Sequence, residues 1–331
     1  MKQSFLIHVK QLLNFKELSY QLLVLITGIC FVLVYNYGAL EFLNVESYVA
    51  GKSQTPYQYR TLMAWLAQPI VFLLNTLHID SILSVRPPPF NNVTRVALMS
   101  LNLISIIVLI NLVRFHLGQI LKDPIFARLG SILILYVLPF NLINYPRSNY
   151  WVPYDLSGIA FFYGLFLLGL YNQWRLFFVI FPLAVLNRET VIFVCGILFL
   201  IHFKSYPLKK SMLILTVQVA IFVLLKTWLF YLFEDNPTDK GAKLYMNQIE
   251  PNLDYLKNPM WWPALFASFG FLWLPVVKYF KLIQVSSITT AIACFPLYLI
   301  IMLLVGQIVE VRIFSEYVPF FLVAALIIFH R

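Results

Sequence analysis

The chain has 331 residues, of which 61% are hydrophobic, 17% aromatic and only 11% charged, and its mean hydropathy is +0.81. A soluble domain carries about 25% charged residues, so this composition excludes a soluble enzyme and predicts a polytopic membrane protein. The formal net charge is +10, but the basic residues lie in short clusters between apolar runs. Such clusters are typical of cytoplasmic loops, so we expect no nucleic-acid partner.

Several apolar segments are long enough to cross a bilayer as helices, because a hydrocarbon core about 30 Å thick needs about 20 helical residues. They fall near 19–39, 95–113, 127–144, 155–172, 210–233, 261–280, 287–306 and 312–330. Lys2, Lys10 and Lys16 precede the first segment. No small-x-small cleavage site follows it, so we expect a retained transmembrane helix.

Two further segments are ambiguous. Segment 61–78 is interrupted by Gln68 and Pro69, and segment 174–203 is long enough for one tilted helix or two short ones. If 61–78 lies on the surface and 174–203 forms a hairpin, the basic loop residues collect on one face of the membrane and most acidic residues on the other. We therefore predict an all-α transmembrane bundle of about ten spans with both termini cytoplasmic.

This topology makes residues 1–331 a single integral membrane domain with two long outer loops, about 40–94 and 234–260. Surface-lying helices are expected in the first loop. Shorter polar elements fall on the same outer face, at 144–155, 187–190 and 307–312. The inner loops are short and basic, so any chemistry is expected at the outer face.

The first outer loop carries a carboxylate and an aromatic–cation cluster. Glu46 follows the first span among apolar and aromatic neighbours, where burial would suit it to general-base chemistry; a solvated loop carboxylate is the alternative. Tyr57, Tyr59 and Arg60 could stack on a sugar or bind a phosphate. Interfacial anchoring of a surface helix explains the same three residues equally well.

The element before the span at 155–172 is rich in aromatic residues. Tyr150, Trp151 and Tyr154 suggest a carbohydrate-binding platform. Asp155 comes just before the apolar run, so we expect it to cap that helix, a role that does not exclude a second one.

Charged pairs interrupt two strongly apolar regions. Arg188 and Glu189 lie between two apolar runs, and Glu310 and Arg312 repeat the pattern near the C-terminus. A charge at the bilayer centre costs roughly 2.5 to 3.5 kcal/mol, so such residues normally face protein or water and mark functional sites. Ion pairs that lock helices together are the alternative, and Arg312 could pair with Glu316 one helical turn away.

Lys226 is a lone cation within a span, where it could snorkel outward or pair with a lipid phosphate. The 234–260 loop has mixed charge without ligand spacing, which is typical of a solvated loop. The chain contains no Walker, dinucleotide, HExxH, CxxC or GxSxG motif. We therefore expect neither soluble-nucleotide nor thiol or zinc chemistry, and we assign no metal ligand.

In layout the chain resembles the GT-C superfamily of integral membrane glycosyltransferases. Members carry a large first outer loop with surface-lying helices, an acidic residue soon after the first span, and a second long loop after the seventh span. The matching features are Glu46, segment 61–78, loop 234–260 and Glu310-x-Arg312. Where this chain has Glu46, the family commonly has Asp. Tyr154-Asp155 and Asn187-Arg188-Glu189-Thr190 also resemble small bacterial membrane proteins of this type.

The resemblance implies transfer of a sugar from a polyprenyl-phosphate-linked donor to a glycan, lipid or protein acceptor. This would occur at the outer face of a bacterial inner membrane, in cell-envelope glycan biosynthesis, with membrane lipids as further partners. It assigns proton transfer to Glu46 first and Asp155 second. Phosphate or donor binding falls to Arg60, Arg188, Glu189, Lys226, Glu310 and Arg312, with the two glutamates holding the arginines in place. Sugar or acceptor binding falls to Tyr57, Tyr59, Tyr150, Trp151 and Tyr154. A divalent metal ion stays open as a cofactor.

Three other functions stay open. A lipid-linked glycan polymerase shares most of these features, and intramembrane ion pairs also line the substrate paths of transporters and flippases. A structural subunit would use the pairs only to lock helices. The polar motifs lie on a single membrane face and the sequence has no internal repeat, which favours an enzyme over a transporter.

Overall fold

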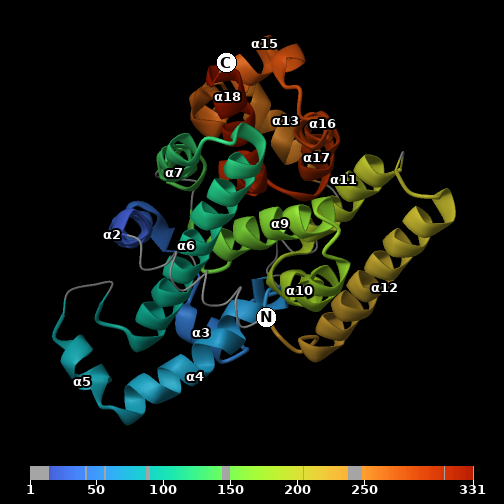
Figure 1. Ribbon diagram of the computed structural model, residues 1–331. Helices are drawn as coiled ribbons and strands as arrows, with labels where there is room; N and C mark the ends of the chain where they lie inside the picture. The colour runs from blue at the N-terminus through green and yellow to red at the C-terminus, as the bar shows by residue number, and fades with distance from the viewer. Residues whose placement is uncertain are drawn as a thin grey trace.

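The computed structural model describes residues 15–41, 43–55, 57–86, 90–143, 150–203, 205–237, 248–308 and 310–330. These residues form an all-α helical bundle (Figure 1), apart from two short strands, β1 (Leu40–Glu41) and β2 (Tyr150–Trp151), that pair in parallel. Six helices in this part of the chain are long and apolar enough to cross a membrane. The predicted membrane-helix class is therefore confirmed, whereas the number of spans stays a prediction.

Helix α6 is the central element of the N-terminal half and crosses the middle of Figure 1. It runs from Val93 to Leu121. At its start the Asn92 side chain accepts a hydrogen bond from the Arg95 backbone N–H at 3.1 Å, and its C-cap residue, Lys122, adopts a left-handed conformation. Its neighbours are α2 (Phe15–Gly38), α4 (Leu62–Thr76), α7 (Pro124–Ile132) and α9 (Asp155–Leu170).

The first long loop contains helices, as predicted. They are α3 (Val45–Val49), η1 (Tyr57–Tyr59), α4 and α5 (Ile79–Ser84). Helix α4 buries Leu62, Met63, Ala64 and Ala67, and its outer face exposes apolar side chains such as Phe72. Helices α4 and α5 extend away from the bundle at the lower left of Figure 1. An apolar outer face on a projecting helix suits a surface-lying segment.

The 174–203 segment consists of α10 (Trp174–Asn187), η2 (Glu189–Val191) and α11 (Ile192–His202). Arg188 is extended, with φ −160° and ψ 138°, so it ends α10. The Trp174 ring, at the start of α10, lies 5.5 Å from the His202 ring at the end of α11. The two helices are therefore antiparallel. The predicted hairpin with Arg188 and Glu189 at its tip is confirmed, and a single continuous helix is excluded.

The remaining helices are α8 (Ile134–Leu142), α12 (Leu208–Leu232), α13 (Ile249–Lys257), η4 (Pro259–Trp261), α14 (Trp262–Ala267), η5 (Ser268–Phe271), α15 (Trp273–Lys278), η6 (Phe280–Leu282), α16 (Ser286–Ala293), α17 (Phe295–Val305), η7 (Val311–Tyr317) and α18 (Val318–Phe329). Several expected spans are thus two short helices in sequence. Between α14 and α15, Phe269 and Gly270 have positive φ, and the Phe269 N–H donates to Oδ1 of buried Asn141 at 2.9 Å. The side chain satisfies a backbone donor that the break releases.

Helix α9 is mostly buried and positions the polar residues described below. It packs on α6, α10 and α11, and its apolar residues surround its whole circumference, as expected of a helix in the centre of a bundle. His202 at the end of α11 contacts the Gly169 carbonyl oxygen near the end of α9, at 3.0 Å. The tip of the hairpin therefore lies beside the N-terminus of α9.

Gly169→Ala should destabilise the protein, because a Cβ at this position would overlap the Leu198 side chain of α11. We expect a loss of about 1 to 3 kcal/mol of unfolding free energy, typical of overpacking. Gly196→Ala is the matched control, since a Cβ there has no heavy atom within 4 Å. Thermal unfolding in detergent measures both. Equal midpoints for the two variants would contradict the close approach of α9 to α11.

Candidate functional site

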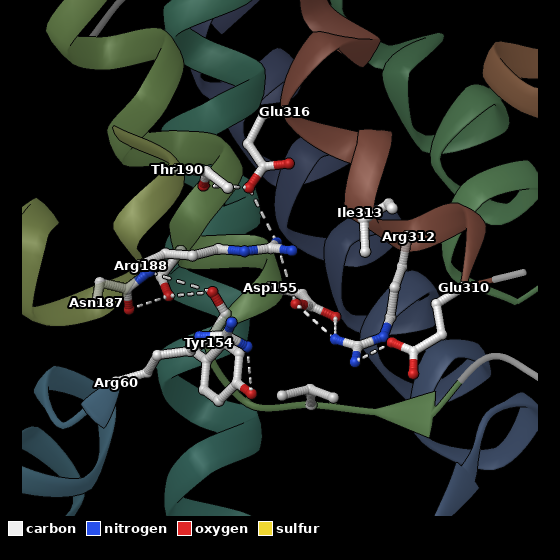
Figure 2. A network of polar contacts seen from close by, with 12 residues as sticks. Arg60, Tyr154, Asp155, Asn187, Arg188, Thr190, Glu310, Arg312, Ile313 and Glu316 are labelled. Atoms are coloured by element: carbon white, nitrogen blue, oxygen red, sulfur yellow. Dashed lines mark hydrogen bonds and ion pairs between the residues drawn. The ribbon is translucent and has the colours of Figure 1, made fainter. Parts of the chain in front are cut away.

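A network of charged side chains from distant parts of the chain gathers around the start of α9, and Figure 2 shows most of it. It contains the cations Arg60, Arg188, Lys226 and Arg312 and the carboxylates Asp155, Glu189, Glu310 and Glu316. The formal charges of these side chains cancel. Most of them are buried, as expected of charges that are retained at membrane depth only when paired.

Asp155 is the centre of the network, and its side chain is fully buried. Oδ1 accepts hydrogen bonds from Arg188 at 3.2 Å and from Arg312 at 3.3 Å, and Oδ2 accepts from Arg312 at 3.2 Å and from the Tyr35 hydroxyl at 3.3 Å. Asp155 lies in the first turn of α9, where the helix dipole favours a carboxylate. Tyr154 is the N-cap residue, so Asp155 does place the predicted carboxylate at the helix N-terminus, while its hydrogen bonds go to Arg188, Arg312 and Tyr35.

The two central arginines have different second partners. Nη1 of Arg188 lies 3.0 Å from Oε1 of Glu316, and Nη2 of Arg312 donates to Oε2 of Glu310 at 2.5 Å. Thr190 and Tyr298 donate their hydroxyls to Glu316, at 2.7 and 3.1 Å. Both carboxylate oxygens of Glu316 therefore have partners inside the protein.

The predicted pair between Arg312 and Glu316 is wrong. Both residues lie on η7, a 3₁₀ segment with about three residues per turn, so residues four apart no longer share a face. The prediction that Glu189 holds Arg188 is wrong too, because adjacent side chains on the chain point in different directions.

Glu189 instead pairs with cations from two other elements. Arg60 donates Nε to Oε2 of Glu189 at 3.1 Å and Nη2 to Oε1, which makes the pair bidentate. Lys226 of α12 lies 3.8 Å from Oε2 of Glu189 and donates to the Tyr59 carbonyl oxygen at 3.4 Å. The side chains of Arg60 and Lys226 are 12% and 10% exposed and that of Glu189 is 38% exposed, so this part of the network reaches the surface.

Tyr154 connects the two groups of charges. Arg60 donates Nη1 to its hydroxyl at 2.8 Å, and the Arg60 guanidinium lies 4.9 Å from the ring centroid. Asn187 donates its amide to the Tyr154 carbonyl oxygen at 3.2 Å and accepts from Ser157 at 2.8 Å, which fastens the hairpin tip to the start of α9. Burial raises the pKa of Tyr154 above its ordinary value, while Arg60 opposes the rise, so the phenol is neutral and accepts from Arg60.

The network thus divides into two halves of opposite net charge. The cation-rich half contains Arg60, Lys226 and Glu189, with a formal charge of +1. The carboxylate-rich half contains Asp155, Glu310 and Glu316 with the arginines Arg188 and Arg312, with a formal charge of −1. Glu310 is 17% exposed, whereas Asp155 and Glu316 are completely buried.

Tyr57 is half-buried at the start of η1, and its carbonyl oxygen accepts from the Arg60 backbone N–H at 3.2 Å. Burial raises its pKa well above the ordinary value, Tyr154 and Glu310 raise it further, and Arg312 and Arg60 lower it.

The other predicted sugar-binding residues have mixed positions. Trp151 and Tyr154 are buried within the fold, so neither offers a face to solvent. The ring of Tyr59 packs against Phe230, with centroids 4.7 Å apart. Tyr150 is partly buried in strand β2. The rest of the predicted platform, 144–149, lies outside the described residues.

Glu46 lies outside the network. Helix α3 buries Val45, Tyr48 and Val49, which turns Glu46 outward, where its Oε1 accepts from the Asn92 amide at 2.9 Å. The expectation that Glu46 is buried is therefore wrong. Its role as a base stays a prediction.

Sequence reasoning did not assign Tyr35, Tyr298 or Thr190 to this site. Each hydroxyl lies in or beside an apolar helix and donates to Asp155 or Glu316. The available signal was that a hydroxyl buried in an apolar environment needs a hydrogen-bond partner. Within the described part of the chain, no group of three or more His, Cys, Asp or Glu side chains could hold a metal ion.

Comparisons with protein-family models, curated proteins and solved structures find no match for this chain. The resemblance to the GT-C superfamily therefore stays a prediction from sequence layout.

Asp155→Asn should strongly destabilise the protein, because Arg188 and Arg312 would lose the carboxylate that they share. Removing one partner of a buried ion pair typically costs about 3 to 5 kcal/mol of unfolding free energy. Asp254→Asn is the control, since Asp254 forms an exposed pair with Lys257 and its loss should leave the midpoint nearly unchanged. A thermal midpoint for Asp155→Asn equal to that of the control would show that the central pair does not stabilise the fold.

Proposed function

We propose that this protein is an integral membrane glycosyltransferase of the GT-C type, which transfers a sugar from a polyprenyl-phosphate-linked donor to an acceptor hydroxyl. The observation that carries the proposal is the division of the polar network into a cation-rich half and an adjacent carboxylate-rich half. Sugar transfer from a lipid phosphate needs both charges: cations for the leaving phosphate and a carboxylate for the acceptor proton.

The donor phosphate binds at the cation-rich half. Arg60 and Lys226 share Glu189, whose side chain is 38% exposed and so brings this half to the surface. A phosphate can therefore replace the most exposed member, Glu189, on the planar fork of Arg60, which matches phosphate as well as carboxylate geometry. The aromatic residue Tyr57, whose carbonyl oxygen accepts from the Arg60 backbone N–H, contacts the sugar.

The acceptor proton goes to Glu310. Asp155 is unsuited to this role because it is buried and accepts from both arginines, and Glu46 lies elsewhere. Glu310 binds Arg312 through Oε2 and is partly exposed. In the reaction, the acceptor oxygen forms a bond to the anomeric carbon, the bond from that carbon to the phosphate oxygen breaks, the electron pair leaves with the phosphate, and Glu310 takes the hydroxyl proton.

Arg188 and Arg312 act as positioning residues. Sequence reasoning assigned the phosphate to them, but each is only 4% exposed and already bound to two carboxylates. Arg312 links Asp155 to Glu310, so it fixes the orientation of the base. A rigid arrangement of this kind needs little reorganisation during reaction.

The proposed topology has about ten passes, with α4 and α5 on the outer surface of a bacterial inner membrane and both termini cytoplasmic. The passes are the six long apolar helices, α9, α10, α11 and the α14–α15 pair. Successive passes cross the membrane in opposite directions, which supports the location of the site at the outer face. The end of α2, the start of α9 and the hairpin tip then share one membrane face.

Arg60→Gln should weaken binding of polyprenyl phosphate, because a charge-assisted pair of hydrogen bonds to the phosphate is lost. We expect a decrease in affinity of roughly ten-fold to one hundred-fold, measured with the full chain in nanodiscs. The neutral polyprenol of equal length should bind weakly to every variant. Arg175→Gln, at an exposed position at the far end of α10, serves as control. Equal affinities for the phosphate and the alcohol would refute the phosphate site.

Glu310→Gln should lower the rate of sugar transfer by about 10² to 10⁴, the usual contribution of a general base, with donor affinity retained. Membranes containing each variant receive radiolabelled polyprenyl-phosphate hexoses, and label in the acceptor is counted. Glu46→Gln is the matched comparison. If Glu46→Gln abolishes transfer and Glu310→Gln does not, the base is Glu46. Passage of the donor across vesicles holding only this protein, without transfer, would favour a flippase.

A further inference from the structure

A second group of charged residues lies at the opposite end of α2 and α6 from the network described above. Nη1 and Nη2 of Arg114, on α6, donate to the two carboxylate oxygens of Glu17 at 2.5 and 2.7 Å. Arg128, on α7, donates Nη2 to Oε2 of Glu17 at 3.1 Å. Two guanidinium groups thus converge on one carboxylate, and the group keeps a formal charge of +1.

A cavity of about 470 Å³ lies beside this group, between α2, α6 and α7. Its lining residues are Glu17, Gln21, Asn111, Arg114, Phe115, Gly118, Gln119, Pro124 and Ala127. Its volume falls within the range of small-ligand sites, about 300 to 1,000 Å³. The lining thus combines the ion pair of Glu17 and Arg114 with the amides of three uncharged polar side chains.

The arginine at this cavity is held rigidly. Its guanidinium lies 4.4 Å from the centroid of the Tyr20 ring, and the Tyr20 hydroxyl is 2.9 Å from the hydroxyl of Ser131. Gln21 donates to Glu17 at 3.1 Å and to Asn111 at 3.0 Å. In the described part of the chain, the buried Nε of Arg128 has no hydrogen-bond partner. The group of Glu17, Arg114 and Arg128 beside the cavity is preorganised and keeps a formal charge of +1, which suits an anion with several acceptor oxygens.

The surface around the cavity is apolar. Leu18 and Leu22 on α2, Phe115 on α6, and Ile125 and Leu129 on α7 are between 48% and 66% exposed. The same three helices therefore provide both the charged cavity and an apolar exterior. This combination fits an amphiphile whose anionic headgroup enters the cavity while its chains lie along the helices.

We propose that this cavity binds the phosphate group of an anionic phospholipid. Free phosphate shares the headgroup chemistry, but it leaves the apolar rim without a partner. The site is independent of sugar transfer, because none of its residues belongs to the polar network at the other end.

The test compares phosphatidylglycerol with phosphatidylcholine of the same acyl chains, added to the full chain in detergent and followed by native mass spectrometry. Phosphatidylglycerol should be retained preferentially, and Arg114→Gln should lower this preference by about five-fold, as expected for one cation facing an anionic lipid. Arg175→Gln, exposed and outside the cavity, should keep it. Equal retention of the two lipids, or equal loss in both variants, would overturn the proposal.

A second variant tests the proposal independently, in case Arg114→Gln does not fold. Gly118 lines the cavity, and a Cβ there would have its nearest neighbour, the Ala127 Cβ, at 3.9 Å, so Gly118→Leu fills the cavity without altering an ion pair. It should lower phosphatidylglycerol retention with an unchanged melting temperature; undiminished retention would place the lipid elsewhere. The last measurement adds inorganic phosphate alone and follows the melting temperature. If it raises the melting temperature and phosphatidylglycerol is not preferred, the ligand is free phosphate and the lipid proposal fails.

Discussion

The sharing of one buried carboxylate, Asp155, between Arg188 and Arg312 is the interaction on which the polar end of this structure depends. The three residues come from the start of α9, the tip of the α10–α11 hairpin and η7. Each would be costly to bury alone, so the elements that carry them are held together. The hairpin can turn at Arg188 because its side chain finds Asp155 and Glu316 at that depth.

The same pairing separates charges that reach the surface from charges that do not. With Arg188 and Arg312 occupied inside, Arg60, Glu189 and Glu310 remain as the accessible members of the network. The site therefore presents a cation and a carboxylate from different elements. A fully buried network would only lock helices, whereas this one extends to the surface on both its positive and its negative side.

Both ends of the bundle use arginines that converge on a single acidic side chain. At one end Asp155 receives two arginines within a dense hydrogen-bonded network. At the other, Glu17 receives Arg114 and Arg128 beside a cavity with an apolar rim. The first arrangement is closed by surrounding hydroxyls, and the second leaves room for a headgroup. The same kind of ion pair therefore supports different roles according to the space beside it.

The sequence by itself determined the membrane-helix class, the helices of the first outer loop and the hairpin in 174–203. Those features follow from local composition and from the distribution of charge between loops. Only the tertiary structure decided which charges pair. Arg188 binds Glu316 because η7 is a 3₁₀ segment that turns Glu316 away from Arg312, and Glu46 faces outward because α3 buries its other side. Pairing depends on side-chain direction and on contacts between distant elements, which spacing along the chain does not contain.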